Sequence, residues 1–369
     1  MKKVLIVFGT RPEAIKMSPV VKAFQKENLY FETRVCVTAQ HREMLDQVLD
    51  FFDITPYYDL DLMKPNQNLY SLTGDIINGL KPVLEEFVPD VVLVHGDTTT
   101  SAATALAAFY AGSKVGHVEA GLRTYNKLAP FPEEINRQLT GRIADYHFAP
   151  TEKSKSNLLM EQIAEESILV TGNTVIDALF ESVERVKDNI DNDLINSLEK
   201  IVGDHEIVLV TGHRRENFGD GFLNICAALK EIALNFNGKV IYPVHLNPNV
   251  QKPVHDILGD VDNIKLIDPL PYEGFVWMMN RSKIIITDSG GVQEEAPSLG
   301  KPVLVMRETT ERPEAVDAGT VILVGADKNK ISSEAIDLIK DSDRYKRMSA
   351  LHNPYGDGKA AERIVNFFK

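Results

Sequence analysis

The sequence predicts an α/β protein built from two Rossmann-like, doubly wound domains that face a central cleft. Short runs of β-branched and other apolar residues alternate with longer amphipathic segments, which is typical of parallel strands covered by helices. This alternation occupies both halves of the chain. The length of 369 residues also favours two domains over one.

The first half contains the strands of the predicted N-terminal domain, residues 1–172. A further strand-like run ends at Gly172-Asn173, and a polar helix follows, so we place the domain boundary there. The strand-like runs before it are Val4–Phe8, Thr33–Thr38, Val91–His95, Val115–Val118 and Tyr146–Ala149.

The second half repeats this pattern and forms the predicted C-terminal domain, residues 173–355. After a turn, the C-terminal helix 356–369 is expected to pack back on the first domain. The strand-like runs of the second half are Ile207–Val210, Val240–Val244, Ile264–Ile267, Ile284–Thr287, Val303–Met306 and Val321–Val324.

The composition excludes several classes of protein. Lys and Arg number 40 against 53 Asp and Glu, a net charge of −13, which argues against sequence-independent binding to nucleic acid or to an anionic membrane. No apolar run approaches the ~18 residues that span a bilayer, and we expect a cytoplasmic protein. The two cysteines, Cys36 and Cys226, lack the spacing of a disulfide framework or a thiolate zinc site.

The turn after the first strand carries two cations. Ligands of open α/β sheets bind beyond the carboxyl ends of the strands, so residues just after each apolar run are informative. Arg11 and Lys16 lie in this turn and in the first turns of the helix that follows it. Helix N-termini favour anions, so we expect both cations to contact an anionic ligand. The alternative is a solvated turn with surface cations.

Carboxylates follow the next two strands. His95 precedes Asp97 by two residues, and His117 precedes Glu119 in the same way, so each pair is expected to share a strand face. Glu133 adds a third acidic position close behind in sequence. Such acids suit acid/base chemistry. Two alternatives are a metal site made by the histidine–acid pairs, and acids that cap helices beside buried histidines.

The first strand of the second half ends in His213, Arg214 and Arg215. This cluster is a plausible binding position for a phosphate-rich leaving group, although the two arginines cannot both point the same way. Surface cations are the alternative interpretation.

A later strand ends in a Gly-Gly turn that opens a helix. Small residues let backbone N–H groups approach phosphate oxygens, and a glutamate one turn into the helix can reach ribose hydroxyls. Arg307 and Arg312 follow the next strand and add positive charge where a diphosphate would lie. Carboxylates in the first domain and a diphosphate pocket in the second indicate an enzyme that acts on a nucleotide sugar.

Five long motifs carry a resemblance to a known family. The chain resembles the non-hydrolysing UDP-N-acetylglucosamine 2-epimerases of bacteria essentially from end to end. The resemblance implies a glycosyltransferase-B fold, a homodimer, no cofactor, no required metal, and interconversion of UDP-GlcNAc and UDP-ManNAc. The motifs are Phe8–Lys16, Val94–Thr98, His117–Arg123, Thr211–Asn217 and Asp288–Glu295.

The resemblance also implies roles for single residues. Asp97, Glu119 and Glu133 form the acid/base and oxocarbenium-stabilising set, and which of them takes the C2 proton stays open. His213 contacts the phosphate and assists departure of the leaving group. The implied binding residues are Arg11 and Lys16 as anchors, Ser289, Gly290 and Gly291 for the phosphates, Glu295 for the ribose, Arg312 for the sugar or its phosphate, and Leu270 and Phe275 for the uracil.

Members of this family often bind a second UDP-GlcNAc that activates the enzyme. The corresponding segment here contains Gln40, His41 and Glu43. Several relatives have Gln in place of Glu43 and Arg in place of Asn66. A carboxylate in place of an amide disfavours a nearby anion, and allosteric activation is a prediction for this chain.

Four other functions compete with reversible epimerisation. A hydrolysing epimerase would release free ManNAc and UDP, and a glycosyltransferase of the same fold would need a sugar acceptor and yield no epimer. A metal hydrolase would use the two histidine–acid pairs. A non-catalytic nucleotide-sugar sensor would not need three acids at one edge of a sheet.

Overall fold

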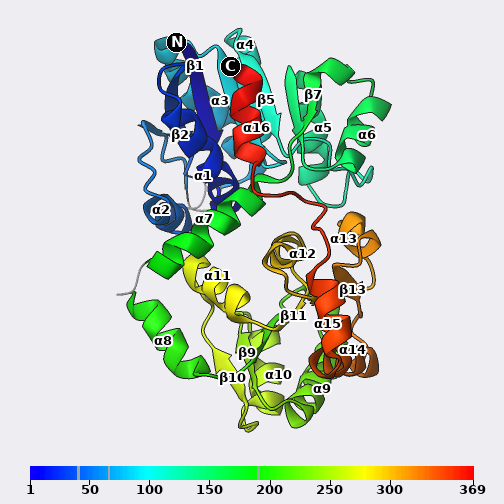
Figure 1. Ribbon diagram of the computed structural model, residues 1–369. Coiled ribbons are helices and arrows are strands. Elements are labelled where there is room, and N and C mark those ends of the chain that lie inside the picture. Colours follow the sequence, from blue (N-terminus) through cyan, green and yellow to red (C-terminus); the bar gives the residue numbers. More distant parts are fainter. Residues whose placement is uncertain (40–41, 65–66, 189–191) are drawn as a thin grey trace. The chain divides into compact units, whose positions relative to one another are not determined.

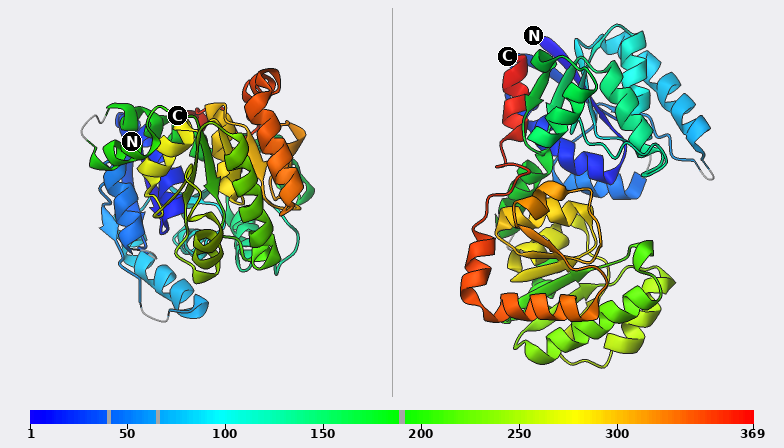
Figure 2. Two further views of the ribbon diagram at one scale, coloured as in Figure 1. Left: turned by 90° about the horizontal axis from the view of Figure 1, so that it is seen from below. Right: turned by 90° about the vertical axis from the view of Figure 1, so that its right-hand side faces the viewer.

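The structure is a computed structural model that describes residues 1–39, 42–64, 67–188 and 192–369 (Figure 1). The chain forms two compact units. Unit 1 comprises Met1–Ala178 and Tyr355–Lys369, and unit 2 comprises Leu179–Pro354. Figure 2 shows from two further sides that each unit consists of a sheet covered by helices.

Unit 1 contains a seven-stranded parallel sheet in the order β3-β2-β1-β4-β5-β6-β7. The chain winds outward from β1 in both directions, which is the doubly wound arrangement that the sequence predicts. Its elements are β1 Lys2–Phe8, α1 Arg11–Lys26, β2 Phe31–Val37, α2 Arg42–Phe51, β3 Tyr58–Asp59, α3 Leu69–Phe87, β4 Val91–His95, α4 Thr99–Tyr110, β5 Lys114–Val118, α5 Glu133–Ile143, β6 Tyr146–Ala149, α6 Glu152–Met160, η1 Glu165–Ser167, β7 Ile168–Val170, the first turns of α7 Thr174–Asp188, and α16 Ala360–Phe368.

The strands of unit 1 alternate their side chains between two buried faces. Leu5 and Val7 pack with α3 and α4 on one face of the sheet. On the other face, Phe368 of α16 contacts Phe148 of β6 and Phe24 of α1 through their rings. Burial on both faces explains why these strands are continuously apolar in the sequence.

The last helix, α16, packs in unit 1, and its first residues are capped by Asp177 from the part of α7 that belongs to unit 1. Asp177 accepts hydrogen bonds from the backbone N–H groups of Ala360 (3.2 Å) and Ala361 (2.9 Å). Lys2 donates from Nζ to the carbonyl of Phe368 (2.8 Å) at the other end. The first and last segments of the chain therefore lie side by side, as Figure 1 shows for β1 and α16.

Unit 2 contains a six-stranded parallel sheet in the order β10-β9-β8-β11-β12-β13. Val208, Tyr242 and Ile286, on three neighbouring strands, pack with α9, α10 and α14 in one apolar core. Its elements are the rest of α7, α8 Asp193–Val202, β8 Ile207–Thr211, η2 Arg215–Asn217, α9 Asp220–Asn235, β9 Lys239–Pro243, α10 Pro248–Leu258, β10 Ile264–Ile267, α11 Tyr272–Arg281, β11 Ile284–Thr287, α12 Gly290–Glu295, η3 Ala296–Leu299, β12 Val303–Val305, α13 Pro313–Asp317, β13 Val321–Leu323, α14 Lys328–Lys340 and α15 Ser342–Ser349.

The predicted α/β class with two doubly wound sheets is confirmed. The sequence analysis missed β3, a two-residue strand at the edge of the first sheet. No helix within the described ranges is both long enough and apolar enough to cross a bilayer.

Candidate active site

The turn between β1 and α1 is held by a buried carboxylate. Glu13 is 1% exposed, and its Oε2 accepts from the backbone N–H groups of Gly9 (3.1 Å) and Thr10 (2.9 Å). Its Oε1 accepts from Thr98 Oγ1 (2.7 Å) at the start of α4. Burial raises the pKa of Glu13. The Glu13 carboxylate therefore links, through hydrogen bonds, the turn that precedes Arg11 and the turn that follows β4.

Glu119 has an unusual backbone conformation and several polar neighbours. It follows β5 with a φ of 61°, a left-handed conformation that is uncommon for a non-glycine residue and often marks a functional position. Lys16 Nζ contacts its Oε2, and Asn173 Nδ2 donates to the same oxygen at 2.8 Å. His95 Nε2 lies 3.7 Å from that oxygen. The backbone and its partners together fix this carboxylate at the carboxyl end of the sheet.

The structure pairs the histidines and acids differently from the sequence prediction. His95 approaches Glu119 instead of sharing a contact with Asp97, because Glu119 turns out of the strand direction. Asp97 forms an ion pair with Arg137 of α5. His117 lies with its Nε2 2.7 Å from the carbonyl oxygen of Gly96. The histidine–acid contact that the structure shows is thus His95 with Glu119, between residues of two neighbouring strands and their ends.

Burial favours the neutral form of three histidines in unit 1. Burial lowers the pKa of His95 to about 4 and that of His117 to about 3. His147 on β6 is also buried, and its pKa falls to about 4. Among the residues that the structure describes, no group of three or more His, Cys, Asp and Glu side chains has the geometry of a metal site.

Two adjacent glutamates at the start of α5 have different surroundings. Glu134 is fully buried, and it accepts from the backbone N–H groups of Thr124 and Tyr125, both at 3.0 Å. Glu133 is partly exposed, and its buried Oε2 has no hydrogen-bond partner among the described residues. Glu134 is thus a structural residue, whereas Glu133 retains capacity to bind a ligand.

Asn173 and Arg137 contact acids of the predicted catalytic set, and sequence reasoning assigned them no role. Asn173 follows Gly172 in a segment that the sequence identified only as the domain boundary. Arg137 lies on α5, 40 positions from Asp97. A local pattern holds no signal for contacts of this kind.

We expect Asn173→Asp to impair catalysis through Glu119. The Oδ1 of Asn173 accepts from the Val175 backbone N–H (3.1 Å), and aspartate can keep that bond. It replaces the donor to Glu119 with a second negative charge, which favours protonation of nearby acids. The kcat at pH 7 should fall about 10²-fold, and the acidic limb of the kcat/KM profile should move to higher pH. An unchanged pH profile would contradict this role.

In unit 2, three residues meet beyond the carboxyl ends of the central strands. The His213 ring stacks on that of His245, with centroids 5.1 Å apart and an interplanar angle of 13°. The carboxylate of Asp288 is fully buried, and its Oδ1 lies 3.8 Å from His213 Nδ1. Arg214 Nε donates to the Asp288 carbonyl oxygen (3.2 Å). Sequence reasoning identified His213 but gave no role to His245 or Asp288.

The Gly-Gly segment opens α12, as the sequence suggests. A Cβ atom at Gly290 would lie 2.9 Å from Cζ of Arg312, so glycine is what permits this arginine to lie close to the backbone. Arg312 Nε donates to Glu294 Oε1 (2.8 Å). Gly290 therefore lies beside a guanidinium, between Ser289 and Gly291, with Glu295 buried at the end of the helix.

Arg307 is less available to bind a diphosphate than the sequence suggests. Its Nε donates to Glu216 (2.7 Å) and its Nη1 to Glu311 (2.9 Å), and its side chain is 7% exposed. Two carboxylates thus neutralise the positive charge that the sequence places near a diphosphate. Arg215, in contrast, is exposed in η2.

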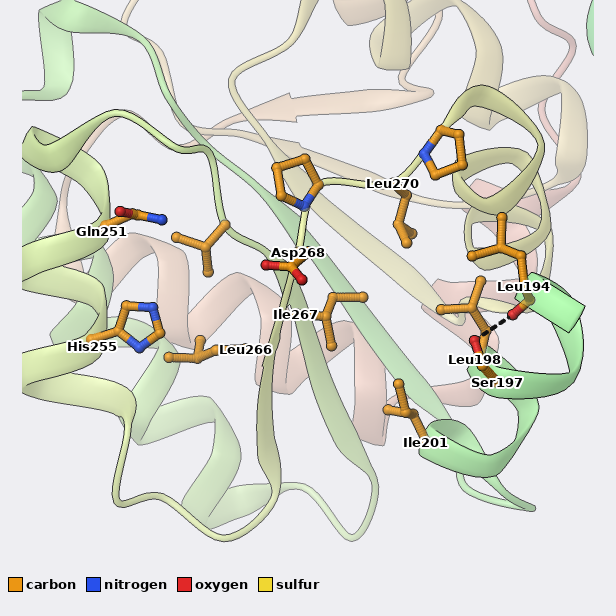
Figure 3. A pocket seen from close by; sticks show the side chains of 13 residues that line it. Leu194, Ser197, Leu198, Ile201, Gln251, His255, Leu266, Ile267, Asp268 and Leu270 are labelled. Carbon is orange, nitrogen blue, oxygen red and sulfur yellow. Dashed lines mark hydrogen bonds between the residues drawn. The ribbon is translucent and has the colours of Figure 1, made fainter. Parts of the chain in front are cut away.

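A cavity of about 440 Å³ lies along β10, the edge strand of unit 2, between α8 and α10 (Figure 3). Leu270, one of the predicted uracil contacts, lines it from the loop after β10. Phe275 is half-buried on α11. Other lining residues include Leu194, Leu198, Ile201, Gln251, His255 and Leu266.

Part of the predicted regulatory segment lies among the described residues. Gln40, His41 and Asn66 lie outside the described residues, and Glu43 is exposed in the first turn of α2. Arg11 is the first residue of α1 and is partly exposed.

Comparisons with known proteins show the family to which the chain belongs. The family model of UDP-N-acetylglucosamine 2-epimerases matches residues 22–369. The chain is 60% identical to the UDP-N-acetylglucosamine 2-epimerase of Salmonella typhimurium over 370 aligned positions, covering 100% of this chain and 98% of the relative.

Solved structures extend the comparison. The UDP-GlcNAc 2-epimerase of Neisseria meningitidis, crystallised with UDP-GlcNAc, shares 54% identity and a TM-score of 0.88, with 99% of each chain covered. That of Methanocaldococcus jannaschii shares 36% identity and a TM-score of 0.87, with 100% of this chain and 99% of the other covered. Family model, sequence and structure agree over nearly the whole length. The chain belongs to the UDP-N-acetylglucosamine 2-epimerase family.

Proposed function

We propose that this protein interconverts UDP-GlcNAc and UDP-ManNAc by eliminating UDP to a 2-acetamidoglucal and adding it back. The observation that carries the proposal is Glu119, whose backbone is left-handed and whose carboxylate contacts Lys16 and Asn173. The family supports the substrate, since its member from Neisseria meningitidis was crystallised with UDP-GlcNAc.

The chemistry of the sugar requires this order of events. The C2 proton of UDP-GlcNAc has no adjacent ketone to make it acidic. Breaking the anomeric C–O bond first sends the electron pair to the diphosphate and builds positive charge on the ring. A carboxylate can then take the C2 proton, which leaves a C1–C2 double bond. Returning a proton to the opposite face of C2 and UDP to C1 gives the epimer.

Unit 1 supplies the acid/base groups in this proposal. Asp97, Glu119 and Glu133 are carboxylates that follow neighbouring strands or open the next helix, and acids on both faces of C2 are needed for inversion. The carboxylates also stabilise positive charge that develops on the ring. Arg11 and Lys16 anchor the anionic substrate.

Unit 2 binds the nucleotide in this proposal. His213 contacts the phosphates and favours departure of UDP, while Ser289, Gly290 and Gly291 offer backbone N–H groups to the phosphate oxygens. Arg312 binds the sugar or its phosphate, and Glu295 binds the ribose hydroxyls. Leu270 and Phe275 contact the uracil, Leu270 through its backbone and Phe275 by stacking.

The test follows the glycosidic oxygen. UDP-GlcNAc with ¹⁸O in the bridge between C1 and the β-phosphorus is incubated with the protein. We expect ¹⁸O to move into the non-bridging positions of the β-phosphate of recovered UDP-GlcNAc about as fast as UDP-ManNAc forms. Epimer formation with ¹⁸O retained in the bridge would contradict elimination. Release of free ManNAc and UDP would identify a hydrolysing epimerase.

We also propose that the protein works as a cytoplasmic homodimer that a second UDP-GlcNAc activates. Activation predicts a sigmoidal rate curve against UDP-GlcNAc and a lag when UDP-ManNAc is the sole substrate. A hyperbolic curve without a lag would contradict activation. The exposed Glu43 offers a direct variant, since Glu43→Gln removes a negative charge that disfavours an anion and should lower the activating concentration.

A further inference from the structure

Three side chains follow three neighbouring strands of unit 2, and together they form an arrangement that the proposed function does not fully use. His245 comes two residues after β9, His213 two residues after β8, and Asp288 directly after β11. These strands are neighbours in the sheet. The carboxyl ends of parallel strands meet at one edge, which explains why residues so far apart in sequence converge.

Asp288 presents one carboxylate oxygen to the backbone and the other to His213. Its Oδ2 accepts from the backbone N–H groups of His213 and Arg214, both at 2.9 Å. Its Oδ1 is buried with no hydrogen-bond partner among the described residues, and His213 Nδ1 lies 3.8 Å away. A buried carboxylate oxygen without a donor is costly, so a proton on His213 Nδ1 is favoured at this position.

His245 has the opposite preference. Its Nδ1 accepts a hydrogen bond from the backbone N–H of Asn247 (3.1 Å), so that nitrogen carries no proton. Neutral His245 therefore has its proton on Nε2, and a second proton would break the bond to Asn247. Because the two rings stack, charging both would also place like charges face to face.

We propose that Asp288 and His245 are positioning residues that make His213 the single proton carrier of the stacked pair. Nδ1–H of His213 points to Asp288, and Nε2–H is left free to donate to an anionic oxygen. This inference rests on the proposed function in taking that oxygen to belong to the diphosphate of a nucleoside diphosphate sugar.

The charge surroundings of His213 make this protonation dependent on the ligand. Burial lowers the pKa of His213, Asp288 raises it, and Arg214 lowers it, as a positive charge on the stacked His245 ring would, with a net decrease. His213 is then largely neutral in the free protein at pH 7. The negative charge of a bound diphosphate favours the imidazolium, and the site takes up a proton when the nucleotide binds.

In the elimination, the protonated ring acts by hydrogen bonding. The C1–O bond breaks, and its electron pair stays on the oxygen of the β-phosphate. His213 Nε2–H donates to the diphosphate and stabilises the added charge, and its proton remains on nitrogen. When UDP returns to C1, the same hydrogen bond weakens, so the arrangement serves both directions.

The first experiment measures the protonation of the two rings by NMR with UDP as the probe. The full chain is labelled with ¹⁵N-histidine, and the signals of His213 and His245 are assigned by His213→Gln and His245→Gln among the nine histidines. We expect His245 Nδ1 to remain a hydrogen-bond acceptor when UDP binds. We expect UDP to raise the pKa of His213 by at least about one unit.

The variant Asp288→Asn tests the carboxylate. Its amide oxygen can still accept from the backbone N–H groups, while its NH₂ faces His213 Nδ1 and opposes a proton there. In the UDP complex, the pKa of His213 should fall by at least about one unit relative to the unaltered protein. The kcat should fall about 10²-fold at pH 8 and partly recover toward pH 6, with little change in KM.

The stacked ring is tested by a pair of variants. His245→Phe keeps a ring face against His213 and should retain kcat within about threefold, whereas His245→Ala should lower kcat about tenfold. His205→Phe is the matched control, because His205 is exposed two residues before β8, at the opposite end of that strand from His213. It should leave both kcat and the NMR titrations unchanged.

The outcomes separate this inference from the proposed function. If His245 takes the first proton, or if Asp288→Asn leaves the pKa of His213 in the UDP complex unchanged, the inference is wrong even if the protein is an epimerase. If the NMR results are as expected and no epimer forms, the proton assignment stands and the proposed reaction is wrong. Equal kcat losses in His245→Phe and His245→Ala would overturn the stacking role.

Discussion

Glu119→Gln should lower kcat for epimerisation by about 10³-fold while the protein still binds UDP. The amide keeps the size of the carboxylate, so the surroundings formed by Lys16, Asn173 and His95 are preserved in shape. It cannot accept the C2 proton, and it does not stabilise positive charge on the ring as a carboxylate does. The rate is measured by NMR of product formation, and UDP affinity by calorimetry.

The matched control for this variant is Glu152→Gln. Glu152 is an exposed glutamate in the first turn of α6, and the same chemical change there should leave kcat unaltered. If Glu119→Gln retained more than about a tenth of the original kcat with unchanged UDP affinity, Glu119 would not take part in proton transfer.

Acid should destabilise unit 1 strongly between pH 7.5 and 5. The pKa values of His95, His117 and His147 fall to about 4, 3 and 4 through burial, below the ordinary value of 6.5. The unfolded chain therefore binds more protons than the native protein below pH 6.5, so the free energy of unfolding decreases as pH falls. Each histidine contributes about 2 kcal/mol of loss at pH 5.

Urea unfolding at the two pH values measures this effect. The single tryptophan, Trp277, lies in unit 2, so a circular dichroism transition that tryptophan fluorescence does not follow reports unit 1. His117→Gln should reduce the loss at pH 5 by about 2 kcal/mol, because glutamine does not gain a proton. His205→Gln, an exposed substitution, should not change the loss. A midpoint independent of pH would contradict neutral buried histidines.

The fold was predictable because the central strands of both sheets are buried on both faces. Runs such as Val4–Phe8 and Ile284–Thr287 stay apolar along their length and contrast with the amphipathic helices between them. Strand β3 has only two residues, Tyr58 and Asp59, at a sheet edge, so no periodic pattern could reveal it.

The candidate site was predictable in its residue types and less so in its contacts. The position of Asp97 and Glu119 after their strands followed from the apolar runs. The contact of Glu119 with His95 could not be predicted in this way. The alternation of side chains along a strand places His117 and Glu119 on one face, whereas the left-handed φ of Glu119 redirects its side chain. The contact of Asn173 with Glu119 spans 54 positions and depends on the completed fold.

The same limit applies in unit 2. The chain motif around Asp288 suggested a phosphate-binding turn, and the Gly-Gly pair does open a helix. The burial of Asp288 beneath the His213 backbone requires that β8 and β11 be neighbours, which no local segment specifies. For Arg307 the sequence suggested a positive charge near a diphosphate. It could not show that two carboxylates, those of Glu216 and Glu311, neutralise this charge in the folded chain.

Epimerisation through proton exchange at C2 is the central claim, and proton NMR in deuterated buffer tests it most directly. The protein is incubated with UDP-GlcNAc in D₂O containing EDTA. The account predicts UDP-ManNAc that carries deuterium at C2, with deuterium also entering the recovered UDP-GlcNAc. UDP-ManNAc that retains hydrogen at C2, or free ManNAc and UDP with no epimeric nucleotide sugar, would contradict it.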